Sequence, residues 1–133
     1  MKLRMTLYDE VFDCELLVDQ APKLIAQLKK VCPFTSKLAY AKICNDEIFF
    51  QAPFDMMEVE NPVFSVAGHI AFYAPKQTIC IWYRNDTPSL GECNLFGLLK
   101  DEDLERFAFV ADQVWEKQGE EIRVEVIEEG ERE

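Results

Sequence analysis

Residues 66–83 have the sequence VAGHIAFYAPKQTICIWY. They form two runs, and in each run every second residue falls on the same side of the predicted strand. A short break separates the runs, because Pro75 is followed by the polar Lys76 and Gln77. One face of each run is apolar: Ile70, Phe72 and Ala74 in the first, Ile79, Ile81 and Tyr83 in the second. The pattern predicts a β-hairpin with one buried face, which is typical of a small β-barrel.

The segments on either side of this hairpin alternate in the same way. Further strands are predicted over residues 3–7, 12–18, 36–44, 47–52, 63–66 and 122–126. Helical spacing of apolar residues predicts one helix opened by Pro22 and ended by Pro33, and a second helix over 104–115. Residues 53–59 and 85–100 show no period, and 85–100 is predicted to be a long irregular connection. The predicted fold is mainly β, a closed barrel of about eight strands with two capping α-helices.

Length and charge limit the classes of function. The chain has 133 residues, 49% of them hydrophobic, so we expect one domain over residues 1–133. No apolar run reaches the roughly 20 residues that span a bilayer, and the N-terminus alternates where a signal peptide is continuously apolar. We therefore expect a cytoplasmic protein with no membrane partner. The net charge of −11 argues against a nucleic-acid partner.

The C-terminal end is strongly acidic. Residues 120–133, which include the last predicted strand and a short tail, hold seven glutamates and two arginines. Two interpretations stay open: an acidic interaction tail, or a solvated strand with a frayed end.

The cysteines do not predict a metal site or a disulfide framework. There are five of them: Cys14, Cys32, Cys44, Cys80 and Cys93. Their number is odd and their spacing does not suit a metal. A nucleophilic cysteine needs a base nearby, and the only histidine is His69. We interpret the thiols as structural and expect no metal, no cofactor and no catalytic residue.

Six short motifs, in their order and spacing, resemble one protein family. They are Glu15-Leu-Leu-Val-Asp-Gln-Ala-Pro22, Glu47-Ile-Phe-Phe50, Glu60-Asn-Pro62, Gly68-His-Ile-Ala-Phe-Tyr73, Ile79-Cys-Ile-Trp-Tyr83 and Asn94-Leu-Phe-Gly97. Over nearly its whole length the chain resembles the small bacterial cyclophilin-like proteins, a family of unknown function that shares the cyclophilin barrel. Three positions depart from the family's usual residues: His69 replaces an aspartate, Arg84 a glycine and Ile43 a tryptophan.

The resemblance does not imply prolyl isomerase activity. True cyclophilins use an arginine that precedes a phenylalanine and a glutamine at short spacing on adjoining strands. Here Phe50 and Gln51 are adjacent, and no arginine lies between Arg4 and Arg84. Arg84 could donate to a prolyl amide from another strand, which keeps a diverged isomerase as an alternative.

Four residues are predicted to share the face of the central hairpin opposite its apolar one: His69, Tyr73, Trp82 and Arg84. A titratable ring, a guanidinium and two aromatic walls suit a ligand pocket. The same pattern also describes an exterior strand face on which Arg84 stacks against a ring, and both interpretations stay open.

Six further residues are candidate ligand contacts: Tyr40, Lys42, Phe50, Gln51, Glu92 and Asn94. Lys42 beside Glu47 could polarise a carbonyl or form an ordinary cross-strand ion pair. One ring of Phe49 and Phe50 must point inward, and the other could line a groove beside Gln51. Asn94 could contact a ligand or satisfy loop backbone.

The preferred hypothesis is a cyclophilin-like barrel that binds a small molecule or short peptide without catalysis. One alternative is a diverged enzyme, an isomerase or an enzyme of small amides, that uses His69 and Arg84. Another is a non-catalytic subunit or interaction module, which could form a homo-oligomer.

Overall fold

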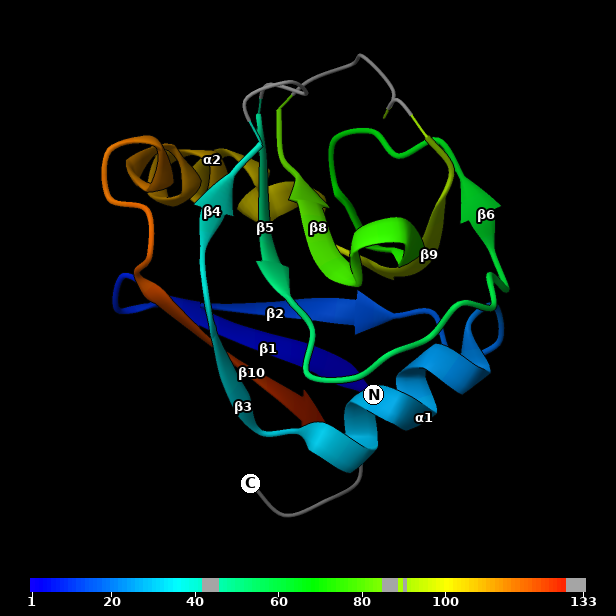
Figure 1. Cartoon of the computed structure of the whole chain (residues 1–133). Helices are drawn as coiled ribbons and strands as arrows, with labels where there is room; N and C mark the ends of the chain where they lie inside the picture. Colours follow the sequence, from blue (N-terminus) through cyan, green and yellow to red (C-terminus); the bar gives the residue numbers. More distant parts are fainter. Residues whose placement is uncertain (42–45, 85–88, 90, 129–133) are drawn as a thin grey trace.

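A computed structural model describes residues 1–41, 46–84, 89 and 91–128 of the chain. The described part contains ten strands, two α-helices and three short 3₁₀-helices (Figure 1). The strands are β1 (Lys2–Leu7), β2 (Glu10–Leu16), β3 (Phe34–Lys37), β4 (Ala39–Tyr40), β5 (Glu47–Gln51), β6 (Pro62–Val63), β7 (His69–Tyr73), β8 (Thr78–Trp82), β9 (Cys93–Leu98) and β10 (Glu121–Ile127). The helices are α1 (Pro22–Val31) and α2 (Leu104–Ala111), with the 3₁₀-helices η1 (Ala74–Lys76), η2 (Asp101–Asp103) and η3 (Asp112–Trp115).

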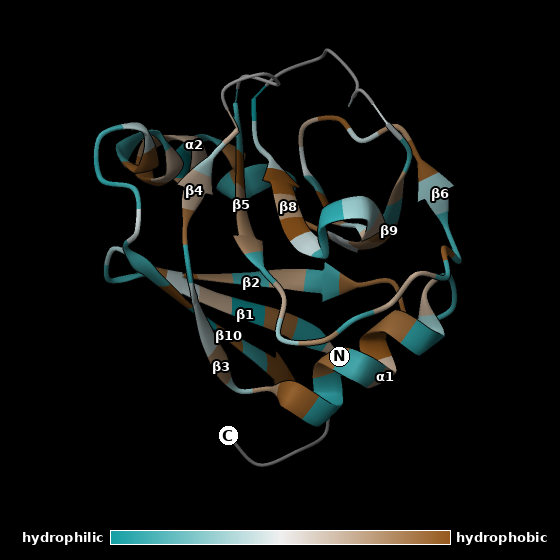
Figure 2. Cartoon of the chain, viewed as in Figure 1, coloured by the Kyte–Doolittle hydropathy of each residue, from teal (hydrophilic) through white to brown (hydrophobic). Residues whose placement is uncertain are grey.

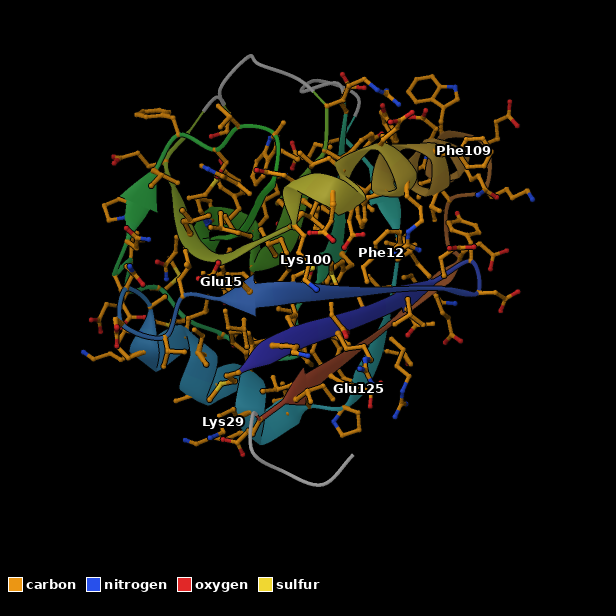
Figure 3. The ribbon with its side chains drawn as sticks, turned by 180° about the vertical axis from the view of Figure 1, so that it is seen from behind. Phe12, Glu15, Lys29, Lys100, Phe109 and Glu125 are labelled. Atoms are coloured by element: carbon orange, nitrogen blue, oxygen red, sulfur yellow. The ribbon has the colours of Figure 1, made fainter. Side chains whose placement is uncertain are left out.

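The strands form one antiparallel sheet, in the order β3-β10-β1-β2-β9-β7-β8-β5-β4, and β6 pairs with β9. Seen from behind, β2, β1 and β10 lie side by side (Figure 3). The mainly β fold with two α-helices is therefore confirmed.

The two ends of this sheet, β3 and β4, are consecutive in the chain and separated only by Leu38. The Leu38 N–H donates to the carbonyl oxygen of Glu120, and the Leu38 carbonyl oxygen accepts from the Gly119 N–H. Ser36 Oγ donates to the Gln51 carbonyl oxygen at 2.8 Å and so links β3 to β5. Among the described residues no strand ladder joins the two ends, so the predicted closed barrel is not confirmed as a continuous hydrogen-bonded cylinder.

Both α-helices pack against one main core. They lie at opposite ends of the molecule, α2 at the upper left and α1 at the lower right of Figure 1, and buried residues from both belong to the same apolar cluster. Hydrophobic and hydrophilic residues both occur along α1 (Figure 2), and its buried residues are Leu24, Ile25 and Leu28. As predicted, this helix begins at Pro22 and ends before Pro33. No helix in the described ranges is long and apolar enough to cross a membrane.

The predicted central hairpin is formed by β7 and β8, which η1 connects. Its inward residues pair across the strands, Ile70 with Ile81 and Phe72 with Ile79, and each is at most 1% exposed. Gln77 ends the turn with a φ of 53°, in the left-handed region that few residues other than glycine adopt. Its side chain also holds the preceding loop, because Oε1 accepts from the Met56 N–H at 2.6 Å and Nε2 donates to the Met56 carbonyl oxygen at 3.0 Å.

The prediction of an irregular connection over residues 85–100 is wrong for Cys93–Leu98, which form β9. This strand lies inside the sheet and pairs with β2, β6 and β7. Five of its six residues are buried, so the sequence contains no alternation of apolar and polar residues to reveal it. Gly97 allows close contact with β7, since a Cβ there would lie 3.3 Å from the Cβ of Ile70.

Two other boundaries differ from the prediction. The strand expected over 36–44 is interrupted at Leu38 and ends at Tyr40, and residues 42–45 lie outside the described ranges. The presence of β9 and the interruption at Leu38 explain why the described chain has ten strands where about eight were expected. The second helix is α-helical only to Ala111 and continues as η3 to Trp115.

Candidate functional site

The outward side of the central hairpin is covered by side chains, as is its inward side. A second apolar cluster lies there, and its buried members are Ala71, Cys80, Trp82, Cys93 and Leu95. Phe49 and Tyr73 are half-buried and pack against this cluster. We use the name outer face for the outward residues of β5, β7, β8 and β9, which are Glu47, Phe49, Gln51, His69, Ala71, Tyr73, Thr78, Cys80, Trp82, Cys93 and Leu95.

Strand β5 brings a carboxylate into the outer face. Glu47 lies opposite Trp82 in the register of β5 and β8, and Phe49 lies opposite Cys80. Glu47 is only 6% exposed, which is rare for a glutamate because burial removes the hydration of the charge. Burial raises the pKa of the Cys80 thiol well above its usual value, and the nearby Glu47 raises it further. This thiol is therefore protonated and is no nucleophile at neutral pH.

Trp82 adds a hydrogen-bond donor beside that carboxylate. The residue is 2% exposed, and its Nε1 has no hydrogen-bond partner among the described residues. Ser65 Oγ and Asn94 Nδ2 are also buried without a hydrogen-bond partner among the described residues. Most buried polar groups in proteins are hydrogen-bonded, so the indole N–H of Trp82 is an exception among the described residues.

His69 and Tyr73 lie on the same face as Trp82, but both are only half-buried. The Val66 N–H donates to His69 Nδ1 at 3.4 Å. Burial lowers the pKa of His69, so its ring is neutral at pH 7. Of the four residues predicted to cluster on the hairpin, His69, Tyr73 and Trp82 therefore share one face. The side chain of Arg84 is instead bound by two aspartates.

That second group lies beside α2, and we call it the Arg84 cluster: Tyr40, Asp46, Tyr83, Arg84 and Asp112. Arg84 Nη1 donates to Asp46 Oδ1 at 2.7 Å, and Nη2 donates to Asp112 Oδ2 at 2.6 Å. The bond to Asp112 is the largest cause that raises the pKa of Arg84. The guanidinium carbon also lies 5.3 Å from the centre of the Tyr83 ring, the stacking that the exterior-face interpretation predicts. The positive charge of Arg84 is thus balanced by two carboxylates, those of Asp46 and Asp112.

Two tyrosines complete the Arg84 cluster. Tyr83 Oη lies 3.2 Å from Tyr40 Oη and 3.3 Å from Asp112 Oδ1. Burial is the largest cause that raises the pKa of Tyr83. Tyr40 Oη accepts from the Asp46 N–H at 3.1 Å, and its ring meets Trp115 edge-on with centres 5.1 Å apart. Tyr40 and Arg84 belong to separate groups of predicted candidates, and the carboxylate partners of Arg84, Asp46 and Asp112, are not among those candidates.

The other candidates on β5 lie in different environments. Phe50 is 1% exposed inside the main core, so Phe49 is the outward ring of that pair. Gln51 is exposed, and its Nε2 donates to the Gln77 carbonyl oxygen at 2.9 Å. Lys42 lies outside the described residues, so its predicted ion pair with Glu47 stays a prediction.

The two candidates near β9 are also separated. Asn94 is fully buried, and its Oδ1 accepts from the Asn61 N–H at 2.9 Å. The amide therefore supports loop backbone, one of the two roles predicted for it. Glu92 is exposed immediately before the strand.

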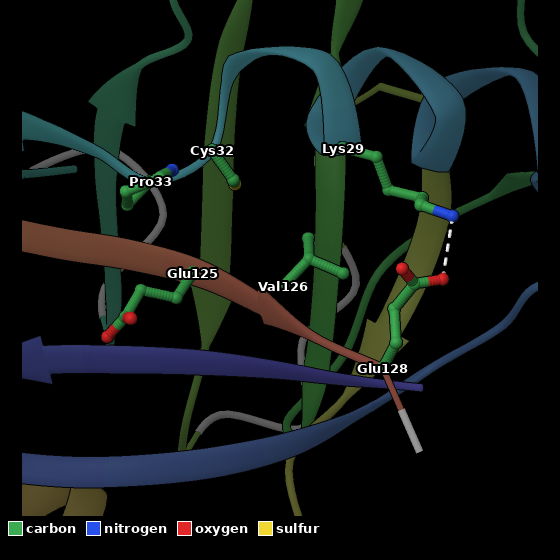
Figure 4. A pocket seen from close by; sticks show the side chains of 6 residues that line it. All are labelled: Lys29, Cys32, Pro33, Glu125, Val126 and Glu128. Carbon is green, nitrogen blue, oxygen red and sulfur yellow. Dashed lines mark hydrogen bonds and ion pairs between the residues drawn. The ribbon is translucent and has the colours of Figure 1, made fainter. Parts of the chain in front are cut away.

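A small cavity lies away from both groups, between the end of α1 and the end of β10 (Figure 4). Its volume is about 140 Å³, and it is lined by Lys29, Cys32, Pro33, Glu125, Val126 and Glu128. Lys29 Nζ pairs with Glu128 Oε1 at 2.7 Å, and burial raises the pKa of Cys32 to about 11. The volume is below the roughly 300–1,000 Å³ of ligand pockets, and no predicted candidate residue lines it. In the ranges that the structure describes, no group of three or more histidine, cysteine, aspartate or glutamate side chains could hold a metal.

Residues 1–125 match the family described as Cyclophilin-like, and the chain belongs to this family. The solved structure of McbB in complex with tryptophan is similar, with a TM-score of 0.82 and 16% identity over 98% of this chain and 46% of the McbB chain. The chain thus spans less than half the length of McbB. The solution structure of the hypothetical protein AF2241 from Archaeoglobus fulgidus is similar with a TM-score of 0.70 and 22% identity, over 94% of this chain and 93% of that one. At such identities both likenesses show the fold alone. A comparison with curated proteins found no match.

Proposed function

We propose that this protein binds a small molecule or short peptide on its outer face and does not catalyse prolyl isomerisation. The observation that carries the proposal is the pairing of the buried Glu47 with Trp82, whose Nε1 has no partner in the described part of the chain. A carboxylate accepts hydrogen bonds and an indole N–H donates one, so together they suit a polar group that does both. Phe49 and Tyr73 provide half-buried rings for an apolar part of the ligand.

The ligand class that fits these groups is a small amide, an amino acid or a short peptide with an apolar side chain. McbB, which shares the fold, was solved with tryptophan, a small molecule that combines an aromatic ring with donor and acceptor groups. This supports a ligand of similar size and chemistry for the present chain. The net charge of −11 disfavours purely anionic ligands.

The contacts of Arg84 support the absence of isomerase activity. An isomerase needs a donor that can reach the prolyl amide, and both terminal nitrogens of Arg84 are engaged by Asp46 and Asp112. We expect no turnover of proline peptides. Turnover that disappears in His69→Ala would instead establish the enzymatic alternative.

A thermal-shift screen tests the binding proposal. The panel holds tryptophan, proline peptides, cyclic peptides, carboxylates, amides and ureido compounds. A ligand at about 100 times its dissociation constant adds roughly 2.7 kcal/mol of stability, which shifts the melting temperature by several degrees. Silence across the panel would favour an interaction module.

A hit is then located with two matched variants. Trp82→Phe keeps an aromatic ring but removes Nε1, and we expect it to weaken binding by about fivefold to tenfold, the effect of one hydrogen bond. Arg84→Ala changes the other polar group, and we expect the affinity to stay within about twofold. The reverse result would move the site to the Arg84 cluster.

We further propose a cytoplasmic location and a barrel that closes through the chain at Leu38. The consecutive positions of β3 and β4 at the two ends of the sheet support this closure.

A further inference from the structure

The surface of α2 and η3 carries large aromatic residues away from the core. Phe109 is 75% exposed and Trp115 is 54% exposed, and Figure 3 shows Phe109 at the periphery of the molecule. The opposite side of the same segment already fills the main core through Phe107, Val110, Ala111 and Val114. The two exposed rings therefore add little to the core of the monomer.

The change from α-helix to 3₁₀-helix aligns these rings. An α-helix turns about 100° per residue and a 3₁₀-helix about 120°. From Phe109 to Ala111 the chain makes two α-helical steps, and from Ala111 to Trp115 it makes four 3₁₀ steps. The summed rotation places Trp115 within about 40° of Phe109 around the helix axis. Glu105, four residues before Phe109, and Asp112, three residues before Trp115, fall on the same side. We call these four exposed residues the α2 stripe: Glu105, Phe109, Asp112 and Trp115.

The surroundings of the α2 stripe are acidic. Residues 101–116 contain six carboxylates and a single arginine, and the whole chain carries −11. That arginine, Arg106, pairs through Nη1 with Glu10 at 2.7 Å and places its guanidinium 3.9 Å from the centre of the Phe12 ring. Within the segment it also lies 3.8 Å from Asp103, whose charge it partly offsets. Within the stripe, Asp112 already pairs with Arg84 at 2.6 Å, so its charge is largely offset. The negative field beside the two aromatic anchors therefore comes mainly from Glu105 and the other carboxylates of residues 101–116.

We propose that the α2 stripe docks a basic amphipathic helix of another protein, with apolar side chains on one face and lysine or arginine on the other. Aromatic residues are the usual anchors of protein interfaces, and opposite charge on the partner speeds and directs its approach. A second copy of this chain fits poorly, since it would bring two acidic stripes of the same sign together. Trp115 is already oriented by its edge-on contact with the Tyr40 ring, which reduces the ordering that binding requires. This surface is separate from the outer face proposed for the small ligand.

Titration calorimetry with the full chain tests this inference. The probe is an amphipathic peptide of about 18 residues, built from leucine at helical spacing and lysine elsewhere. Two control peptides replace all lysines by glutamate or all leucines by serine. We expect measurable binding of the lysine–leucine peptide, at least about tenfold weaker binding of both controls, and an affinity that falls with salt.

Variants decide whether the binding uses the α2 stripe. The double variant Phe109→Ser, Trp115→Ser should weaken binding by at least about tenfold. The matched control is Phe64→Ser, because Phe64 is also 54% exposed but lies next to β6; it should change affinity by less than about twofold. An unchanged melting temperature shows that each variant folds. An unchanged thermal shift with a panel compound that stabilises the unmodified chain separates this surface from the outer face.

Two results would overturn the inference. One is equal binding by the double variant and by Phe64→Ser, which would mean that the peptide is held by charge alone. The other is a dimer of the unmodified chain that sedimentation detects and that Phe109→Ser abolishes, which would make a second copy the occupant.

Discussion

The two faces of the central hairpin are both buried, but by different kinds of residues. Inward, Ile70 and Phe72 of β7 meet Ile81 and Ile79 of β8, and every partner is apolar. Outward, the same strands place Trp82 beside a carboxylate, Glu47, and a thiol, Cys80. The inward residues of the β7–β8 ladder have hydrogen-bonding groups only in their backbone, whereas the outward face buries side-chain donors and acceptors.

This difference separates a face that stabilises the fold from one that can recognise a ligand. Apolar side chains in a filled core gain stability from packing and from removal of surface from water. Buried polar groups lower stability unless they are hydrogen-bonded, so the unpartnered Nε1 of Trp82 is a cost to the isolated fold. A ligand that accepts from this donor removes the cost.

The largest effect is expected on the inward face. Ile81→Ala removes a fully buried side chain that pairs with Ile70 and Ile48. We expect a loss of about 2–5 kcal/mol in the free energy of unfolding, measured by urea denaturation, because a cavity remains in a dense core. The control Val11→Ala, at a position that is 47% exposed, should cost less than about 0.5 kcal/mol. Equal losses would contradict the comparison.

A substitution on the outward face should lower the free energy of unfolding less than Ile81→Ala does. Trp82→Phe keeps an aromatic ring and removes an N–H that has no partner among the described residues. We expect a loss of only about 1 kcal/mol in the same denaturation experiment. A loss as large as that of Ile81→Ala would show that the outer face is also optimised for stability.

The Arg84 cluster tests whether a polar group outside both faces contributes to the fold. Arg84 is 47% exposed and pairs with Asp46 and Asp112. Because solvent screens such pairs, Arg84→Ala should cost about 0.5–1 kcal/mol, and high salt should reduce this difference. The control is Arg123→Ala, whose pair with Glu125 is longer, at 3.5 Å, and whose side chain is 50% exposed, close to the 47% of Arg84. A larger cost for Arg123→Ala would be inconsistent with this account.

The smallest expected effect is a pH dependence from His69. Burial lowers the pKa of His69 below its ordinary 6.5 in the folded protein, so the unfolded chain takes up a proton first as the pH falls. The stability that the neutral ring contributes is present above about pH 6.5 and is lost as the pH falls below it. In His69→Gln, unfolding free energies measured from pH 7 to pH 5 should therefore fall less steeply than in the unmodified chain. A steeper fall would mean that His69 gains a proton more readily when folded.

The sequence predicts the inward face well, for a physical reason. Side chains of a strand with one apolar face alternate, and Ile70, Phe72, Ile79 and Ile81 show this directly. The strand β9 is missed because both of its faces are buried, and because Asn94 and Gly97 are residues typical of turns. Here packing against β7, which is remote in the chain, overrides the local signal.

The candidate site is predicted only in its parts. His69, Tyr73 and Trp82 are placed together because they alternate along one hairpin. The ion pairs of Arg84 are not predicted, because its partners Asp46 and Asp112 are 38 and 28 residues away in the chain and no local pattern indicates them. The burial of Glu47 could not be foreseen for the same reason, since it depends on the neighbouring strand β8.

The junction at Leu38 has a consequence for how the protein behaves at high concentration. Sheets with long free edges recruit further strands from other molecules and polymerise. In this sheet the first and last strands have only four and two residues, and a single residue joins them whose backbone N–H and carbonyl are both engaged by the turn at Gly119 and Glu120. Edge strands this short offer few free backbone groups to an incoming strand, so we expect little edge-to-edge association through β3 and β4 at high concentration.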